Sequence, residues 1–324
     1  MQLCLDEAPV ELPPPPTNVP WVEKYRPRSL DDIKSQDGFC RVLKEFIKIK
    51  SLPHLLLYGP PGCGKTSTIM ALARDMFGVN YKFMVLELNA SDDRGISVIR
   101  EKIKSFARLK NFVCFDLPKL IVLDEADSLT DDAQFALRRV IEKYTSNVRF
   151  CLICNYIHKL IPAIQSRCLT FQFASIADNT VVEKLTEIIT AEELDVDVDV
   201  INVIVSMGES DMRKNINCLQ ILSKNNTITI DSVFRYFFQA SKDTFDILIS
   251  AMNMSFEERQ AILIDLSQQS LSIQQIIDML AHWALVDNNY TFVRELGRIQ
   301  LEYMQSNANF EWLFVNAIAC IPIE

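Results

Sequence analysis

One short run near the start of the chain constrains its fold more than any other feature. Residues 59–66 read Gly-Pro-Pro-Gly-Cys-Gly-Lys-Thr, directly after an apolar run at 55–58 and before a stretch with helical spacing. Glycines at this spacing let the backbone curl, so that successive N–H groups can surround phosphate oxygens. The start of the following helix adds positive potential. The run therefore predicts a phosphate-binding loop between a strand and a helix.

The residues of this loop have separate predicted roles. We expect Lys65 to reach the β- and γ-phosphates of a nucleotide, and Thr66 to ligate Mg²⁺. The segment expected to bind the nucleotide consists of Gly59, Pro60, Pro61, Gly62, Cys63, Gly64, Lys65, Thr66 and Ser67.

A second chemical element is a pair of adjacent carboxylates, Asp124 and Glu125, after the apolar run 120–123. In open α/β sheets, ligands bind at the carboxyl ends of the strands. We expect Asp124 to hold Mg²⁺ through water, and Glu125 to polarise the water that attacks the γ-phosphate. The pair alone is a weak signal. Combined with the phosphate loop in the same predicted sheet, it is typical of a nucleotide hydrolase.

The hydropathy pattern predicts an α/β domain followed by helices. Between residues 54 and 175, short apolar runs alternate with amphipathic stretches, as in a parallel sheet with crossover helices. After about residue 174 the apolar spacing is helical. The predicted strands are 55–58, 84–88, 120–123, 149–154 and 169–173, and the clearest later helices are 180–191, 210–223 and 231–239.

Composition excludes some classes of function. No apolar run approaches the roughly 18 residues of a membrane span, and the N-terminus lacks the pattern of a secretory signal. A net charge of −9 argues against a general nucleic-acid binder. However, residues 94–110 hold six basic residues against one acid, Glu101, so a local DNA site stays open.

Nine cysteines are scattered along the chain. Cys151 and Cys154 form a C-x-x-C, which could bind zinc, but they lie inside an apolar run without a second such motif. Reduced thiols in a strand are the favoured interpretation.

Several further motifs accompany the phosphate loop. They are Trp21-Val-Glu-Lys-Tyr-Arg-Pro27, Leu86-Glu-Leu-Asn-Ala-Ser-Asp-Asp-Arg-Gly95, Asp124-Glu-Ala-Asp127 and Ser166-Arg-Cys168. Together with the phosphate loop, these motifs resemble the small subunits of sliding-clamp loaders, the replication factor C branch of the AAA+ ATPases. The resemblance covers about residues 20–220, and the stretches 52–58 and 136–142 are most similar to the subunit-5 type.

The resemblance implies ATP and Mg²⁺ as cofactors and a division into domains. It implies a disordered leader over 1–18, an AAA+ nucleotide-binding α/β domain over 19–174, an all-helical lid over 175–239, and an all-helical collar for oligomerisation over 240–324.

The resemblance also implies roles for single residues around the nucleotide. Val22 and Arg26 would line the ATP-binding cleft. Asn155 would sense the γ-phosphate, and Arg213 would reach the nucleotide from the lid. From the residues alone, Asn155 could equally cap a strand end, and Arg213 could be an ordinary surface residue of a helix.

Arg167 in Ser-Arg-Cys has the role least evident from its own chain. The resemblance implies an arginine finger, a catalytic residue supplied in trans to the γ-phosphate bound by a neighbouring subunit. A local salt bridge is the alternative.

The resemblance places Arg94, Arg100 and Lys159 where clamp loaders contact the DNA phosphate backbone. Phosphate contacts carry no sequence code, as a loader that works on any sequence requires. Alternatively, Asp92 and Asp93 could pair with these arginines.

The implied function is ATP binding and hydrolysis in a replication factor C complex. This heteropentamer has a large subunit and three other small subunits, and it loads the sliding clamp PCNA onto primer-template DNA in replication and repair. A nuclear location without membrane association follows. Two rival functions are a nucleotide-binding subunit that never turns over and a homohexameric AAA+ helicase or remodeller. Four residues depart from the family pattern: Lys34, Thr170, Gln172 and Ser210.

Overall fold

The computed structural model describes residues 19–91, 95–108, 117–224, 228–238, 240–268, 271–305 and 317–321. The chain divides into two compact units. The first consists of the described parts of 1–188 together with 210–217, and the second consists of 189–209 and the described parts of 218–324. Helices α8 (Asp178–Ala191) and α10 (Met212–Ser223) contribute to both units.

A five-stranded parallel sheet forms the centre of the first unit, with strand order β2-β3-β4-β1-β5. All five strands predicted from the sequence are confirmed, with boundaries that differ by one residue at most. The strands are β1 (Leu55–Tyr58), β2 (Val85–Asn89), β3 (Lys119–Asp124), β4 (Val148–Cys154) and β5 (Leu169–Gln172). This order puts the carboxyl ends of β1, β3 and β4 next to one another.

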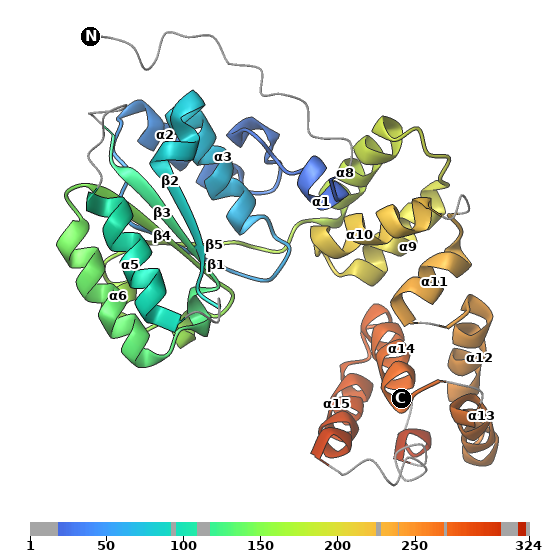
Figure 1. The fold of residues 1–324 in the computed structure, drawn as a ribbon. Helices are drawn as coiled ribbons and strands as arrows, with labels where there is room; N and C mark the ends of the chain where they lie inside the picture. The colour runs from blue at the N-terminus through green and yellow to red at the C-terminus, as the bar shows by residue number, and fades with distance from the viewer. Residues whose placement is uncertain are drawn as a thin grey trace. The chain divides into compact units, whose positions relative to one another are not determined.

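Helices cover both faces of this sheet (Figure 1). Helices α2 (Asp37–Lys48) and α3 (Lys65–Phe77) lie on one face, and α5 (Gly95–Arg108) and α6 (Asp131–Tyr144) lie on the other. The short elements of this unit are α1 (Trp21–Lys24), η1 (Leu30–Asp32), η2 (Gly78–Asn80), α4 (Tyr81–Met84), η3 (Ala126–Ser128), η4 (Ile157–Lys159) and α7 (Pro162–Gln165).

The central strands are largely apolar because both faces of the sheet are covered. Leu55, Leu56 and Leu57 of β1 have no exposed surface, and β4 is buried over most of its length. The α6 side chains Leu137, Val140, Ile141 and Tyr144 pack against the same core cluster as Phe150 and Leu152 of β4. Thr130 caps α6 by accepting from the Ala133 N–H.

The rest of the chain is helical, as predicted. After α8, the helices are α9 (Val198–Gly208), α10, α11 (Ile230–Phe238), α12 (Lys242–Met252), α13 (Phe256–Gln268), α14 (Ile273–Val286) and α15 (Tyr290–Gln305). Ser241 caps α12, and Ser272 forms a capping box with Gln275 at the start of α14.

The core of the second unit is formed by buried apolar residues of these helices. Leu248 and Met252 of α12, Leu280 of α14 and Phe292 of α15 are each at most 1% exposed. The Trp283 and Phe292 rings meet edge to face with centroids 5.7 Å apart. No helix in the described part of the chain is long and apolar enough to span a membrane.

Candidate nucleotide-binding site

The phosphate loop connects β1 to α3 with a backbone that only glycine adopts readily. Gly62 has φ +69° and Gly64 has φ +90°. A Cβ added to Gly62 would lie 1.9 Å from Asp211 Oδ1, so no side chain fits there unless Asp211 moves. The loop is thus held open by its sequence and by a close contact with the residue before α10.

Lys65 is the first residue of α3 and is only 7% exposed. Its ammonium group donates to Gly59 O (2.8 Å), Pro60 O (2.8 Å) and Asn155 Oδ1 (3.0 Å). All three acceptors are uncharged oxygens. A buried cation that is satisfied only by dipoles fits an anionic ligand, because a phosphate would supply the missing countercharge.

Thr66 and Asp124 bring together the oxygens expected of a Mg²⁺ site. The Thr66 hydroxyl donates to Asp124 Oδ2 at 2.7 Å, and Asp124 Oδ1 accepts from the Glu125 N–H at 2.8 Å. Hydroxyl and carboxylate oxygens are typical ligands of Mg²⁺. The donor set at the end of β3 therefore fits this cation.

Glu125 follows β3 in a strained conformation. Its backbone has φ +53° and ψ +38°, in the left-handed region that few non-glycine residues adopt. Backbone strain of this kind costs on the order of 1–3 kcal/mol and is often found at functional sites. The Glu125 side chain is exposed, and the residue lines the same cavity as Lys65 and Asp124.

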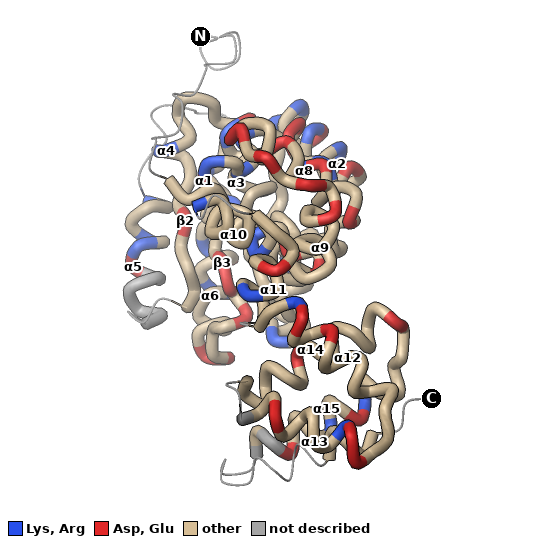
Figure 2. The backbone as a smooth tube through the Cα atoms, turned by 90° about the vertical axis from the view of Figure 1, so that its right-hand side faces the viewer, with Lys and Arg blue, Asp and Glu red and all other residues tan. Residues whose placement is uncertain are grey.

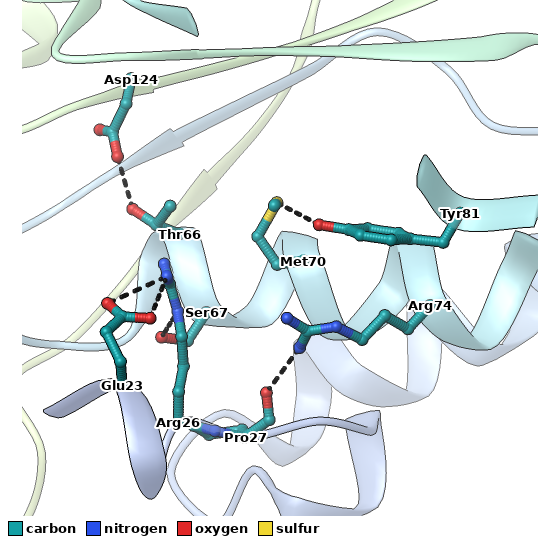
Figure 3. A network of polar contacts seen from close by, with 9 residues as sticks. All are labelled: Glu23, Arg26, Pro27, Thr66, Ser67, Met70, Arg74, Tyr81 and Asp124. Atoms are coloured by element: carbon teal, nitrogen blue, oxygen red, sulfur yellow. Dashed lines mark hydrogen bonds and ion pairs between the residues drawn. The ribbon is translucent and has the colours of Figure 1, made fainter. Parts of the chain in front are cut away.

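The segment before α2 covers the start of α3 (Figure 3). Arg26 donates from Nε to Ser67 Oγ at 3.2 Å, and its Nη1 atom contacts both oxygens of Glu23 at 3.3 and 3.1 Å. Arg74 of α3 donates to Pro27 O at 3.2 Å. These bonds hold Val22 and Arg26 at the rim of the phosphate loop, where both line the cavity.

The turn before α10 contributes Arg213. Asp211 Oδ1 accepts from the Arg213 and Lys214 N–H groups at 2.9 and 3.2 Å and so caps the helix. Ser210 has φ +60°, which explains why the helix predicted from 210 begins at Met212. Glycine would suit this left-handed backbone better than serine.

These segments enclose one cavity of about 240 Å³ within the first unit. The predicted residues that line it are Val22, Arg26, Pro61, Gly62, Cys63, Gly64, Lys65, Thr66, Ser67, Asp124, Glu125, Asn155 and Arg213. Gly59 and Pro60 do not line it, but their carbonyl oxygens accept from Lys65. The cavity therefore joins segments that are far apart in the sequence.

Sequence reasoning missed the apolar wall of this cavity, which is formed by Tyr25, Ile33, Ile176 and Ile216. Four single apolar residues from separate segments carry no pattern that reveals such a wall. Apolar lining residues in the same cavity as a phosphate loop fit a nucleobase.

Lys34, named above as a departure from the pattern of the resembled family, also lines the cavity. Its ammonium forms ion pairs with Glu187 at 2.5 Å and Glu183 at 3.6 Å on α8. The hydrogen bond to Glu187 is the main cause of a raised pKa for Lys34. The pair links the segment before α2 to the start of the later helices.

Arg167 is not among the residues that line the cavity. It follows α7 and is 34% exposed; its Nη1 donates to Ala163 O at 2.6 Å, and its Nη2 pairs with Glu142 of α6 at 2.6 Å. The local salt bridge weighed against the finger role is thus present. An exposed pair of this kind contributes little stability, about 0–1 kcal/mol, and can open at small cost.

The three predicted DNA contacts are described unequally. Arg94 lies outside the described residues, and the side chain of Arg100 on α5 is not described. Lys159 ends η4 with its ammonium 4.9 Å from the Tyr156 ring centroid. Basic residues recur along α5 (Figure 2). One of them, Lys104, pairs with Glu101.

Comparison with known proteins adds to this geometry. Residues 55–176 match the family described as "ATPase family associated with various cellular activities". In fold, the chain is similar to a structure of the Thermotoga maritima RuvB Holliday junction branch migration motor. The TM-score is 0.52, with 15% identity over 78% of this chain and 90% of that one.

Relatives in sequence are more specific. The chain is 46% identical to the probable replication factor C subunit 5 of Dictyostelium discoideum, over 81% of this chain and 78% of that protein. It is 47% identical to the replication factor C small subunit of Aeropyrum pernix, over 75% of each. It is 50% identical to human replication factor C subunit 5, over 63% of this chain and 60% of that protein. The chain therefore belongs to the replication factor C small-subunit family of AAA ATPases.

Proposed function

We propose that this chain is an ATP-binding and hydrolysing subunit of a replication factor C complex. The complex would be a nuclear heteropentamer that loads PCNA onto primer-template DNA in replication and repair. The family supports an AAA+ ATPase subunit of a multi-subunit clamp loader. The single observation that carries the proposal is the complete set of phosphate-binding and carboxylate residues around one cavity.

Each residue of this set has a proposed task. Lys65 holds the phosphate oxygens, since its ammonium is buried and has only neutral acceptors. Thr66 and Asp124 hold Mg²⁺, which when bound with ATP neutralises charge that develops on the phosphate oxygens. Glu125 orients and polarises the attacking water and accepts its proton. Asn155 and Arg213 report the state of the nucleotide from the end of β4 and the start of α10.

Arg167 completes a neighbour's site in this proposal. The guanidinium lies away from its own cavity, so this subunit would depend on an arginine from another chain. Glu142 and Ala163 O hold Arg167 in one orientation until a γ-phosphate competes for the guanidinium. Such fingers raise hydrolysis by about 10³–10⁵-fold.

The test is Arg167→Ala in the assembled complex. This subunit's own ATP affinity should be unchanged, while hydrolysis by the complex slows by at least ~100-fold at the neighbouring site. The isolated chain should be a poor ATPase, because its own site lacks a finger. A purified monomer that hydrolyses ATP as fast as the assembly would contradict the trans role. Arg139→Ala, which removes an exposed arginine of the neighbouring helix α6, is the matched control.

Two rival functions give different results in the same preparation. A subunit that never turns over would retain ATP in the complex as firmly as a slowly hydrolysed analogue. A helicase or remodeller, a class that shares the fold of RuvB, would assemble as a homohexamer. Native mass measurement of the complex separates a heteropentamer from a homohexamer.

A further inference from the structure

The turn after β3 carries a carboxylate without an assigned part in the nucleotide site. Asp127 lies in η3, two residues after Glu125. Its Oδ2 atom accepts from the backbone N–H groups of Asn155 and Tyr156, at 3.2 and 3.1 Å. Asp127 is not among the residues that line the cavity, so any effect on ATP must pass through other residues.

These two bonds lie at the end of β4, where its pairing with both neighbouring strands ends. The register of β4 with β3 ends at Leu152, and its register with β1 ends at Cys154. Asn155 is therefore the first residue beyond both ladders. A charged acceptor forms hydrogen bonds about twice as strong as those of a neutral one. Asp127 can therefore supply the backbone hydrogen bonds that a neighbouring strand no longer provides at Asn155.

The position of Asn155 reaches the phosphate loop through its own side chain. Asn155 Oδ1 accepts from the Lys65 ammonium at 3.0 Å. Asp127 also lies in the short helix η3, which begins directly after the strained residue Glu125. The Glu125 carbonyl accepts from the Ser128 N–H at 2.9 Å. One carboxylate thus ties the end of β4 to the end of β3.

We propose that Asp127 is a positioning residue for ATP hydrolysis, which fixes Asn155 against Lys65 by holding two consecutive backbone N–H groups. The inference rests on the proposed task of Asn155 at the γ-phosphate. A displacement of about 1 Å in a positioned group can cost on the order of 100-fold in rate, so the anchoring matters even though Asp127 does not contact the ligand.

Two substitutions separate anchoring from the mere presence of a charge. Asp127→Ala removes the carboxylate and with it both hydrogen bonds. Asp127→Asn keeps one oxygen, and one oxygen suffices because both N–H groups donate to Oδ2. Asp132→Ala removes an exposed carboxylate of α6 in the same unit and is the control.

The first measurement is turnover in the assembled complex, with the phosphate loops of the other subunits inactivated. Asp127→Ala should lower kcat by ~10- to 100-fold with KM for ATP within about twofold of wild type. Asp127→Asn should stay within about threefold in kcat, and Asp132→Ala should match wild type. A fall in ATP affinity with unchanged kcat, or equal losses in Asp127→Asn and Asp127→Ala, would overturn the proposal.

The second measurement is hydrogen exchange, which needs no ATP. In Asp127→Ala, the Asn155 and Tyr156 amides should exchange at least ~10-fold faster, while Leu152 in the centre of β4 is unchanged. If Asp127→Ala does not fold, Asp127→Asn should still show a smaller acceleration at the same two amides. Wild-type exchange at both positions in a folded variant would refute the anchoring.

A double-mutant cycle tests the route of action. If Asp127 acts through Asn155, then Asp127→Ala in an Asn155→Ala background should lower kcat by less than about twofold further. Effects that multiply would mean that Asp127 acts independently of Asn155, against the proposal. If Asn155→Ala alone left turnover unchanged, the proposed task of Asn155 would fail, while the exchange measurement would still decide the anchoring.

Discussion

Lys65, at the start of α3, joins the phosphate loop to the end of β4 through its hydrogen bonds to Gly59 O, Pro60 O, Cys63 Sγ and Asn155 Oδ1. It is buried at the first position of α3 rather than exposed on a loop. Its substitution removes a buried charge together with its bonds, and these two effects on folding oppose each other. We therefore expect the effect on ligand binding to exceed the effect on stability.

Lys65→Met should lower ATP affinity by ~100-fold, the equivalent of ~2.7 kcal/mol of charge-assisted bonding. The melting temperature should change by less than about 4 °C, which corresponds to a stability change below about 1 kcal/mol. Nucleotide titration and thermal unfolding of the same sample measure both effects. Lys48→Met, at the exposed end of α2, is the control and should bind ATP normally. An unchanged ATP stoichiometry in Lys65→Met would contradict the site.

His54 gives the first unit a pH-dependent contribution to stability. Its Nδ1 accepts from the Phe150 N–H at 3.1 Å, and Nε2 lies 3.3 Å from Thr145 Oγ1. Burial, with a smaller effect of nearby Arg149, lowers the pKa of His54 from 6.5 to about 4. The unfolded state therefore binds more protons between these values, so stability is full above pH 6.5 and falls as the pH drops to about 4.

We expect His54 to account for about 1–2 kcal/mol of the unfolding free energy that is lost between pH 6.5 and about 4. This is less than the whole pKa shift would imply, because the ring is only half-buried. His54→Asn keeps an acceptor for the Phe150 N–H and cannot titrate. Urea unfolding from pH 4 to 7 should be less pH-dependent in this variant. A profile parallel to that of wild type would exclude the role of His54.

Among the elements of the second unit, α13 is tied to the C-terminal segment by one side chain. Arg259 donates from Nη1 to Ala319 O (3.0 Å) and Ile321 O (2.9 Å), and from Nη2 to Met252 O (2.7 Å) and Met254 O (3.3 Å). The guanidinium therefore connects the end of α12 to residues 317–321 through backbone carbonyl groups. A side chain without N–H donors at position 259 would not form these bonds.

Arg259→Met should destabilise the second unit by about 1–3 kcal/mol, because it leaves three partly buried carbonyl oxygens without this donor. Urea unfolding followed by circular dichroism measures the loss. Arg294→Met is the matched control: its side chain is 75% exposed and pairs with Glu295, so we expect a change below about 0.5 kcal/mol. Equal stability of the two variants would show that the four carbonyl contacts contribute little.

For the assembled molecule, the proposed DNA contacts predict a salt dependence. An alanine substitution of Arg94, Arg100 and Lys159 together should reduce the magnitude of the log-affinity versus log-salt slope by about 0.9 for each lost phosphate contact. Affinity should fall by a similar factor on every primer-template sequence, since phosphates carry no sequence code.

Binding at several salt concentrations, measured in the full complex, tests this expectation, and ATP binding should persist in the same sample. Lys242→Ala, in the second unit, is the control. An unchanged slope in the triple variant would mean that these residues pair with local acids such as Asp92 or Asp93, and the DNA assignment would be wrong.

The chemistry of the site could be read from contiguous residues. The phosphate loop and the Asp124–Glu125 pair each lie within a few residues of a strand end, so local backbone geometry fixes what they can bind. The central strands β1, β3 and β4 were predictable because strands covered on both faces are largely apolar. The edge strands β2 and β5 are more exposed and were predictable from their short runs with apolar residues. The roles of Asn155, Arg213 and Arg167 came from family resemblance, because a single amide or guanidinium has no local pattern.

Contacts between distant segments could not be predicted. Asp127 meets the N–H of Asn155 because β3 and β4 are neighbours in the sheet, an order that the sequence does not state. Likewise, Gly62 approaches Asp211, and Lys34 pairs with Glu187, only because the fold brings segments about 150 residues apart together. Local patterns determine each element and its polar groups. The positions of those groups relative to one another depend on long-range packing, since residues 28 to 153 positions apart share no periodicity that could encode their contact.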